Sequence, residues 1–227
     1  MLKIIILDET TKNPLDLIGR TAGICWNADT SDKEKNIKRA KECIKSGHGR
    51  VLEWVEIHLL IEGVSARVMR EFERHHIGAS FLQQSTRYCE WKNDTAIILP
   101  ESVKKVIQEN ENEYAKYCKG FIDWIDFLKE KNVPKEDLAM FYPLGMETKI
   151  VDKRNLRNLI EMFHQRSCTR AYWEYRNIMK EIKGKLSEIS DEWKWIADNY
   201  FIPKCEVAGY CTETKCCGRK PKKEDKL

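Results

Sequence analysis

The chain has no long apolar run, no large excess of charge of one sign and no C-x-x-C cysteine pair. None of its apolar stretches approaches the roughly 18–20 residues that a membrane-spanning helix needs. The formal net charge of the 227 residues is only +4, and the 33% of charged residues are of both signs. This balance argues against a dedicated nucleic-acid-binding protein and allows only a local site for an anion. The N-terminal apolar segment is also too short for a signal peptide, so we expect a soluble, cytoplasmic protein without membrane or nucleic-acid partners.

The missing C-x-x-C pairs also weaken the case for a zinc site, although the chain contains nine cysteines. Most of them are isolated, which favours reduced thiols in a protein without an export signal. The exception is the group Cys205, Cys211, Cys216 and Cys217, which precedes the basic sequence GRKPKKEDKL. A metal site and four reduced thiols both remain open for this group; we expect thiols and no metal. We expect one domain over residues 1–203 and a Cys-rich basic tail over residues 204–227.

Apolar periodicity indicates an α+β fold. Short apolar or alternating segments predict a mixed sheet with strands near residues 2–7, 51–62, 86–91, 96–99 and 148–152. Apolar residues at three- and four-residue steps predict several helices against this sheet, near residues 14–23, 31–46, 101–131 and 155–175. Ser31 is the expected N-cap of the second helix, and a short helix should follow Pro134. The sequence does not determine the strand order.

Glu53 is the one charged residue on an otherwise apolar face of the segment 51–62. If the strand includes it, this carboxylate is buried and needs a partner or a ligand. The alternative, which we favour from this segment alone, is that the strand begins only after Glu53.

An unusual density of hydrogen-bond donors lies in residues 65–91. If its first part is helical, Arg67, Arg70 and Arg74 project from one face. Two interpretations are open, a solvated helix edge neutralised by Glu71 and Glu73, and a binding site. The remaining donors of the segment are Arg87, the pair His75-His76, Gln83, Gln84 and the hydroxyls of Ser80, Ser85 and Thr86.

A second group of cations follows in residues 155–177. Arg166, Arg170, Trp173 and Asn177 recur at helical spacing, on a face next to the apolar one. Two like charges one turn apart are unfavourable unless an anion or separate acidic partners neutralise them. Structural ion pairs and an anion site therefore both explain the pattern.

Taken together, these segments resemble the flavin-dependent thymidylate synthases, over almost the whole chain and in the same order. The Arg-His-Arg element and the Ser-x-Arg-Tyr element of that family match Arg74-His75-His76 and Ser85-Thr86-Arg87-Tyr88. Further matches are Gly47-His48 with Glu53, the set Asn155, Arg157, Arg166, Trp173 and Glu174, and the Cys-rich ending. The chain departs from the family pattern at His76, and also at Gly23 and Ala139, where arginines are common.

The resemblance implies reductive methylation of dUMP to dTMP without an enzymic nucleophile. Methylenetetrahydrofolate would donate the carbon, FAD would act as cofactor, and NADPH would be the reductant. It also implies a homotetramer with sites shared between subunits. The alternative is a relative that binds flavin or nucleotide without methylating dUMP, in regulation or on a modified pyrimidine.

The resemblance also assigns roles to individual residues. Arg166 would be catalytic, contacting the uracil edge and stabilising the negative charge that develops there. The expected dUMP contacts are Glu71, Gln83, Gln84, Ser85, Thr86, Arg87 and Arg166. The expected FAD contacts are Arg74, His75, His76, Glu53, Asn155, Arg157 and Glu161, with His48 and Tyr88 in the folate region.

Overall fold

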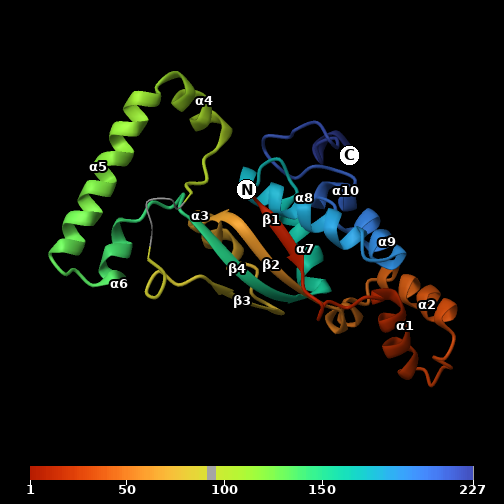
Figure 1. Cartoon of the computed structure of the whole chain (residues 1–227). Helices are drawn as coiled ribbons and strands as arrows, with labels where there is room; N and C mark the ends of the chain where they lie inside the picture. Colours follow the sequence, from red (N-terminus) through yellow and green to blue (C-terminus); the bar gives the residue numbers. More distant parts are fainter. Residues whose placement is uncertain (91–95, 227) are drawn as a thin grey trace.

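The computed structural model describes residues 1–90 and 96–226, and it has a four-stranded antiparallel sheet at its centre (Figure 1). The strand order is β1-β2-β4-β3. The α+β class is confirmed, whereas the mixed sheet is wrong because every neighbouring pair is antiparallel. The strands are β1 (Lys3–Ile6), β2 (Glu56–Ser65), β3 (Ala79–Gln83) and β4 (Glu147–Asn155).

One face of the sheet is buried, and the other carries ion pairs. In β2, Ile57, Leu59 and Ile61 are completely buried. The alternate residues face the opposite side, where Glu56 and Glu62 pair with lysines of β4. The buried face shares one core with α7 (Leu156–Arg166), α8 (Trp173–Ser187) and α9 (Asp191–Tyr200), which lie on one side of the sheet in Figure 1. The burial of every second side chain of β2 is the period-two alternation that a half-buried strand requires.

A helical hairpin precedes β2. It consists of α1 (Pro14–Ile24) and α2 (Lys33–Lys45), which pack so closely that a Cβ on Gly19 would meet the backbone of Asn36. Asp32, not the expected Ser31, caps α2, because its carboxylate accepts two backbone N–H groups of the first turn. The 3₁₀ helix η1 (Gly49–Trp54) follows, so the interpretation that the strand begins after Glu53 is confirmed.

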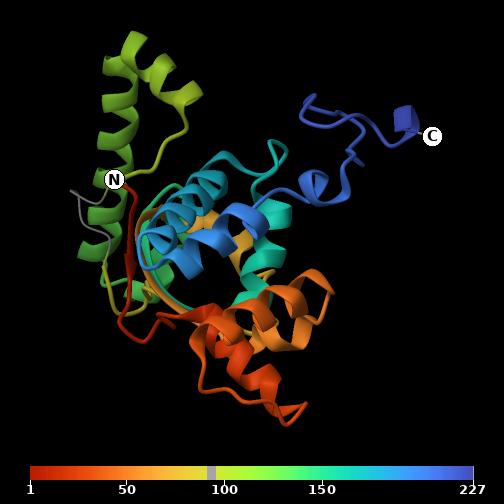
Figure 2. The ribbon, with the colours of Figure 1, turned by 90° about the vertical axis from the view of Figure 1, so that its right-hand side faces the viewer.

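A helical arm extends from the body between β3 and β4. The single helix expected over residues 101–131 is divided at Asn110 into α4 (Glu101–Glu109) and α5 (Glu111–Glu130). Asn110 leaves the helical conformation and its side chain donates to the carbonyl of Val106, which replaces regular helix bonding. No residue of α4 and only Ile125 of α5 is buried. The arm returns through α6 (Lys135–Leu138) and η2 (Ala139–Phe141), and it lies on the opposite side of the body from the C-terminal tail (Figure 2).

Two of the expected strands are wrong. Residues 86–90 form a turn and bend, and Trp91 lies outside the described residues. In the segment 96–99 only Ile97 makes a bridge, to Met146. Instead β3 forms at Ala79–Gln83, where Phe81 packs edge-on against Phe72 while its neighbours remain exposed. Because β3 directs only one large apolar side chain inward, its sequence alternates too weakly between apolar and polar residues to predict a strand.

The two arginine-bearing helices are also shorter than the patterns suggested. The helix α3 (Ala66–Phe72) ends before Arg74, so Arg74 does not share the face of Arg67 and Arg70. The helix α7 ends at Arg166, and a separate turn leads to α8, so Arg166 and Arg170 do not lie on one continuous helix. Arg176 stabilises this turn by donating to two of its carbonyl oxygens.

The tail contains α10 (Lys204–Ala208) and η3 (Glu224–Lys226), and an isolated bridge pairs Cys211 with Lys222 in the segment between them. In the part of the chain that the structure describes, no helix is long and apolar enough to cross a bilayer.

Candidate functional site

Arg166 lies at the C-terminal end of α7, where it contacts residues from two other segments. Its Nη1 donates to Glu71 Oε2 of α3 at 2.8 Å, and its Nε donates to His75 Nε2 at 2.9 Å. Its Nη2 donates to the backbone oxygen of Glu71 at 3.4 Å. The guanidinium also lies over the ring of Tyr175, 5.0 Å from its centroid. The side chain is only 14% exposed, so these contacts fix it in one orientation.

His75 is a neutral hydrogen-bond acceptor in this arrangement. The residue is buried, and burial together with the adjacent Arg166 and Arg154 lowers the pKa of His75 to about 4. Because Nε2 accepts from Arg166, the ring proton must be on Nδ1. A protonated ring would place two cations in direct contact.

The loop that carries His75 is bound to the first turn of α7. Asn158 donates to the carbonyl oxygens of His75 and Ile77, at 3.3 and 2.9 Å. The backbone nitrogen of Asn155, the N-cap of α7, donates to the carbonyl of Gly78 at 2.8 Å. Gly78 has a φ of 78°, and a Cβ there would lie 2.3 Å from the Asn155 side chain. The backbone position therefore requires glycine.

Behind this loop, a buried ion pair within β4 is hydrogen-bonded to α7. Arg154 donates to both carboxylate oxygens of Asp152, at 2.6 and 2.7 Å, and to Asn158 Oδ1 at 2.5 Å. Both charged side chains are completely buried. The Asn158 amide is therefore oriented from the sheet side, and it in turn holds the loop of His75.

A surface next to this loop contains most of the residues expected to contact FAD. Arg157 Nη1 and Glu53 Oε1 form an ion pair at 2.7 Å, which joins α7 to η1. Glu161 lies one turn further along α7, and Arg74 and His76 are exposed in the loop. His48 is exposed at the start of η1 and lines a shallow cavity of about 340 Å³.

The residues expected to bind the nucleotide phosphate form a turn after β3. Ser85 Oγ accepts from the backbone nitrogen of Arg87 at 3.2 Å, and Gln83 Nε2 donates to Thr148 Oγ1 at 3.3 Å. The Arg87 side chain pairs with Glu136 of α6 at 2.9 Å. With Gln84, Thr86 and Lys149, Ser85 lines a cavity of about 240 Å³, and Tyr88 is exposed beside it.

One copy of the chain does not bring all these residues together. The loop of His75 precedes β3, whereas the turn of Arg87 follows it. Five residues of extended strand span about 15 Å. The two groups therefore lie at opposite ends of β3.

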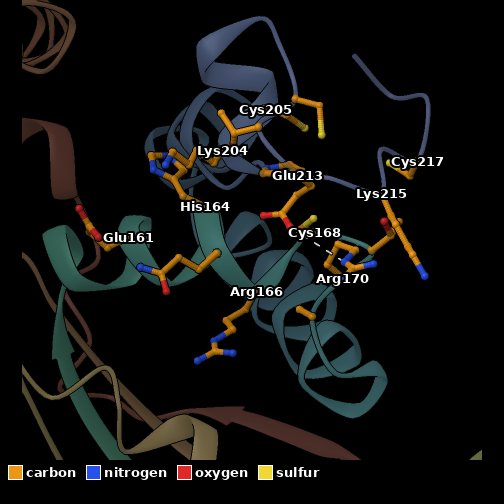
Figure 3. A pocket seen from close by; sticks show the side chains of 16 residues that line it. Glu161, His164, Arg166, Cys168, Arg170, Lys204, Cys205, Glu213, Lys215 and Cys217 are labelled. Atoms are coloured by element: carbon orange, nitrogen blue, oxygen red, sulfur yellow. Dashed lines mark ion pairs between the residues drawn. The ribbon is translucent and has the colours of Figure 1, made fainter. Parts of the chain in front are cut away.

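A cavity of about 530 Å³ lies between the end of α7, the turn that follows it and the C-terminal tail (Figure 3). Its size is in the range of small-molecule sites. Arg166 and Glu161 lie on its α7 side, and Cys205 and Cys217 on its tail side. Within residues 1–90 and 96–226, no group of three or more metal-ligating side chains is arranged to hold a metal ion.

Two residues of this site, Asn158 and Tyr175, were not identified from the sequence, although both lie in the segment 155–177. The one available signal was Asn158, a polar residue among the buried positions of α7. Its partners are distant in sequence, so only the fold identifies them.

The chain matches the family model described as thymidylate synthase complementing protein (Thy1) over residues 6–190. It is 32% identical to a flavin-dependent thymidylate synthase of Pyrococcus furiosus, over 92% of this chain and 89% of that protein. It is 33% identical to a protein of the same name from Clostridium tetani, over 93% of this chain and 91% of the relative.

Two solved structures share the fold. The thymidylate synthase ThyX of Helicobacter pylori, crystallised with FAD and dUMP, superposes with a TM-score of 0.66 at 21% identity. The superposition covers 88% of this chain and 99% of that one. The UMP/dUMP methylase PolB of Streptomyces cacaoi, bound with 5-Br dUMP, gives a TM-score of 0.73 at 13% identity, over 89% and 97% of the two chains.

Proposed function

Because this chain belongs to the thymidylate synthase complementing protein family, we propose that it is a flavin-dependent thymidylate synthase. It methylates dUMP reductively to dTMP, with methylenetetrahydrofolate as carbon donor and NADPH as reductant. The observation that carries this proposal is the fixed orientation of Arg166 beside a cavity of about 530 Å³.

Arg166 binds the edge of the pyrimidine in this proposal. A guanidinium has five N–H donors, and the contacts to Glu71 and His75 use three of them. Two donors remain for a ligand, which suits a planar base edge with adjacent acceptors. For C5 of uracil to attack the carbon donor, negative charge must first build up on the ring, and a permanently charged guanidinium in a fixed place stabilises that charge.

The turn of Ser85, Thr86 and Arg87 binds the phosphate of the nucleotide. A hydroxyl, backbone N–H groups and an arginine together suit a dianion. Arg87 is exposed, and its pair with Glu136 is also exposed, so a phosphate can replace that weak partner. Gln83 and Gln84 lie beside the turn, at the end of β3.

The surface around the loop of His75 fits FAD. Arg70 and Arg74 are exposed, and neither forms an ion pair with another described residue. With Arg157 and the exposed His76 they supply cationic and donor groups for a diphosphate. Bound there, the flavin supplies the hydride. Asn155, Glu53 and Glu161 complete this surface, and His48 and Tyr88 contribute to the folate region.

Two features of the single chain support the proposal of sites shared between subunits of a homotetramer. The two groups of ligand-binding residues lie at opposite ends of β3, so a complete site draws on more than one copy. The α4–α5 arm also exposes large apolar side chains, including Val106, Tyr117, Trp124 and Phe127. Such a helix is stable only when another surface covers it.

Absorbance spectroscopy and product analysis test the proposal. The purified full-length protein, mixed with FAD and freed of excess, should show an oxidised-flavin spectrum that NADPH bleaches. Thymidylate should form only when dUMP and methylenetetrahydrofolate are both present. Flavin binding without thymidylate formation would favour a relative that acts in regulation or on a modified pyrimidine, for which Ala139 in place of an arginine is the motivating feature. A protein that remains colourless contradicts both.

A further inference from the structure

We infer that His75 and Glu71 are positioning residues that act through Arg166: they hold its guanidinium so that two N–H groups face the pyrimidine. The inference rests on the proposed function. It differs from the resemblance, which implied a direct FAD contact for His75 and a direct dUMP contact for Glu71.

The polar atoms of Glu71 are already engaged. Oε2 accepts from Arg166 at 2.8 Å, and Oε1 lies 3.7 Å from Arg67 Nη1. Arg67 is itself held over the ring of Tyr172, 3.8 Å from the centroid. An ionised carboxylate has no donor, and its charge opposes a phosphate dianion, so contact with a nucleotide is unfavourable. Holding Arg166 is the role that its contacts support.

His75 is suited to the same task. Its Nε2 is occupied by Arg166, its backbone oxygen by Asn158, and its ring lies edge-on to Tyr175 at 6.2 Å. The residue is only 7% exposed, so little of the ring is available to a large cofactor. Burial and the neighbouring cations Arg166 and Arg154 favour the neutral imidazole, which can accept a hydrogen bond.

The contacts on Arg166 come from three directions. Glu71 and His75 lie in α3 and the loop that follows it, and the Tyr175 ring lies against the guanidinium from α8. A planar cation held in this way loses little further freedom on binding a ligand. Removing one contact should therefore weaken nucleotide binding more than flavin binding.

The first test compares His75→Phe, which keeps a buried ring without an acceptor, with His75→Gln, which restores an acceptor of similar reach. Dissociation constants for FAD and for dUMP are measured by calorimetry on the full-length protein. His75→Phe should weaken dUMP binding roughly 10- to 100-fold, as expected for loss of a charge-assisted hydrogen bond. FAD affinity should change less than about threefold, and His75→Gln should recover most of the dUMP affinity. His58→Phe, on the exposed face of the sheet, is the matched control.

A loss of FAD affinity as large as the loss of dUMP affinity would overturn the inference, and so would unchanged dUMP affinity in His75→Phe. A second measurement uses no nucleotide, so it distinguishes failure of the inference from failure of the proposed function. In protein labelled with ¹⁵N-histidine, nuclear magnetic resonance should show His75 protonated on Nδ1 and unprotonated on Nε2 at pH 7. A proton on Nε2 would exclude the hydrogen bond from Arg166, whatever the substrate.

Discussion

Glu174 accepts hydrogen bonds from both the backbone nitrogen and the hydroxyl of Ser65, at 2.6 and 2.5 Å, across 109 residues of sequence. The same hydroxyl accepts from Val68 N and so caps α3. Because α3 carries Glu71, this buried carboxylate at the start of α8 determines where one of the partners of Arg166 lies.

We expect Glu174→Gln to lower the free energy of unfolding by about 1–3 kcal/mol, because an amide nitrogen cannot accept from Ser65. Urea denaturation monitored by tryptophan fluorescence measures this loss. Glu188→Gln, at an exposed pair with Lys185, is the control and should change stability by less than about 0.5 kcal/mol. Equal effects of the two substitutions would contradict the buried role of Glu174.

Gly78→Ala should weaken FAD binding and destabilise the protein. The alanine would adopt a left-handed conformation and meet the Asn155 side chain, at a cost of roughly 1–3 kcal/mol. Gly184→Ala is the matched control, because nothing lies within 4 Å of the added Cβ and alanine favours a helix. Thermal unfolding and FAD titration of both variants provide the measurement. If Gly78→Ala is as stable as the wild type, the claim that this backbone position requires glycine is contradicted.

Arg87→Ala should raise the KM for dUMP roughly 10- to 100-fold while the protein retains its flavin, because a charged contact to phosphate is lost. Steady-state kinetics and the flavin spectrum measure the two effects separately. If flavin is lost and the KM is unchanged, Arg87 belongs to the cofactor site instead.

The stability of the protein should fall as the pH is lowered from about 6.5 to about 4. His75 has a folded-state pKa of about 4, below the value of 6.5 of a free histidine, so the unfolded chain binds more protons in this window. The contribution of His75 to the free energy of unfolding is fully present above pH 6.5, and about 3 kcal/mol of it is lost by pH 4. Burial also lowers the pKa of His164, which adds a change of the same sign.

Urea denaturation between pH 7 and pH 4.5 measures this slope. His75→Gln should show a shallower dependence on pH than the wild type. Identical slopes would mean that His75 titrates normally in the folded protein.

The sequence predicts the parts of this fold that depend on local pattern. The alternation of residues 55–61 correctly places one face of β2 in the core, and the apolar stripe of α7 is buried as expected. The strand order depends on contacts between segments far apart, such as the pairing of β2 with β4, and local periodicity carries no such information.

The candidate site shows the same limit. Arg166, His75 and Glu71 were each identified from the sequence, but as ligand contacts and not as partners of one another. Their contact depends on where α3 and α7 end, and helix ends are the least predictable feature of a pattern. Tyr175, whose ring lies against the guanidinium, was not identified as a site residue because a buried aromatic in a helix normally indicates only core packing.

The most direct test of the central claim is thymidylate formation by wild-type protein and Arg166→Ala, each supplied with FAD, NADPH, dUMP and methylenetetrahydrofolate. The proposed role of Arg166 predicts thymidylate from the wild type, and at least roughly 100-fold less from the variant, with flavin still bound, because a fixed donor at the developing charge has been removed. Wild-type turnover in the Arg166→Ala variant would contradict it.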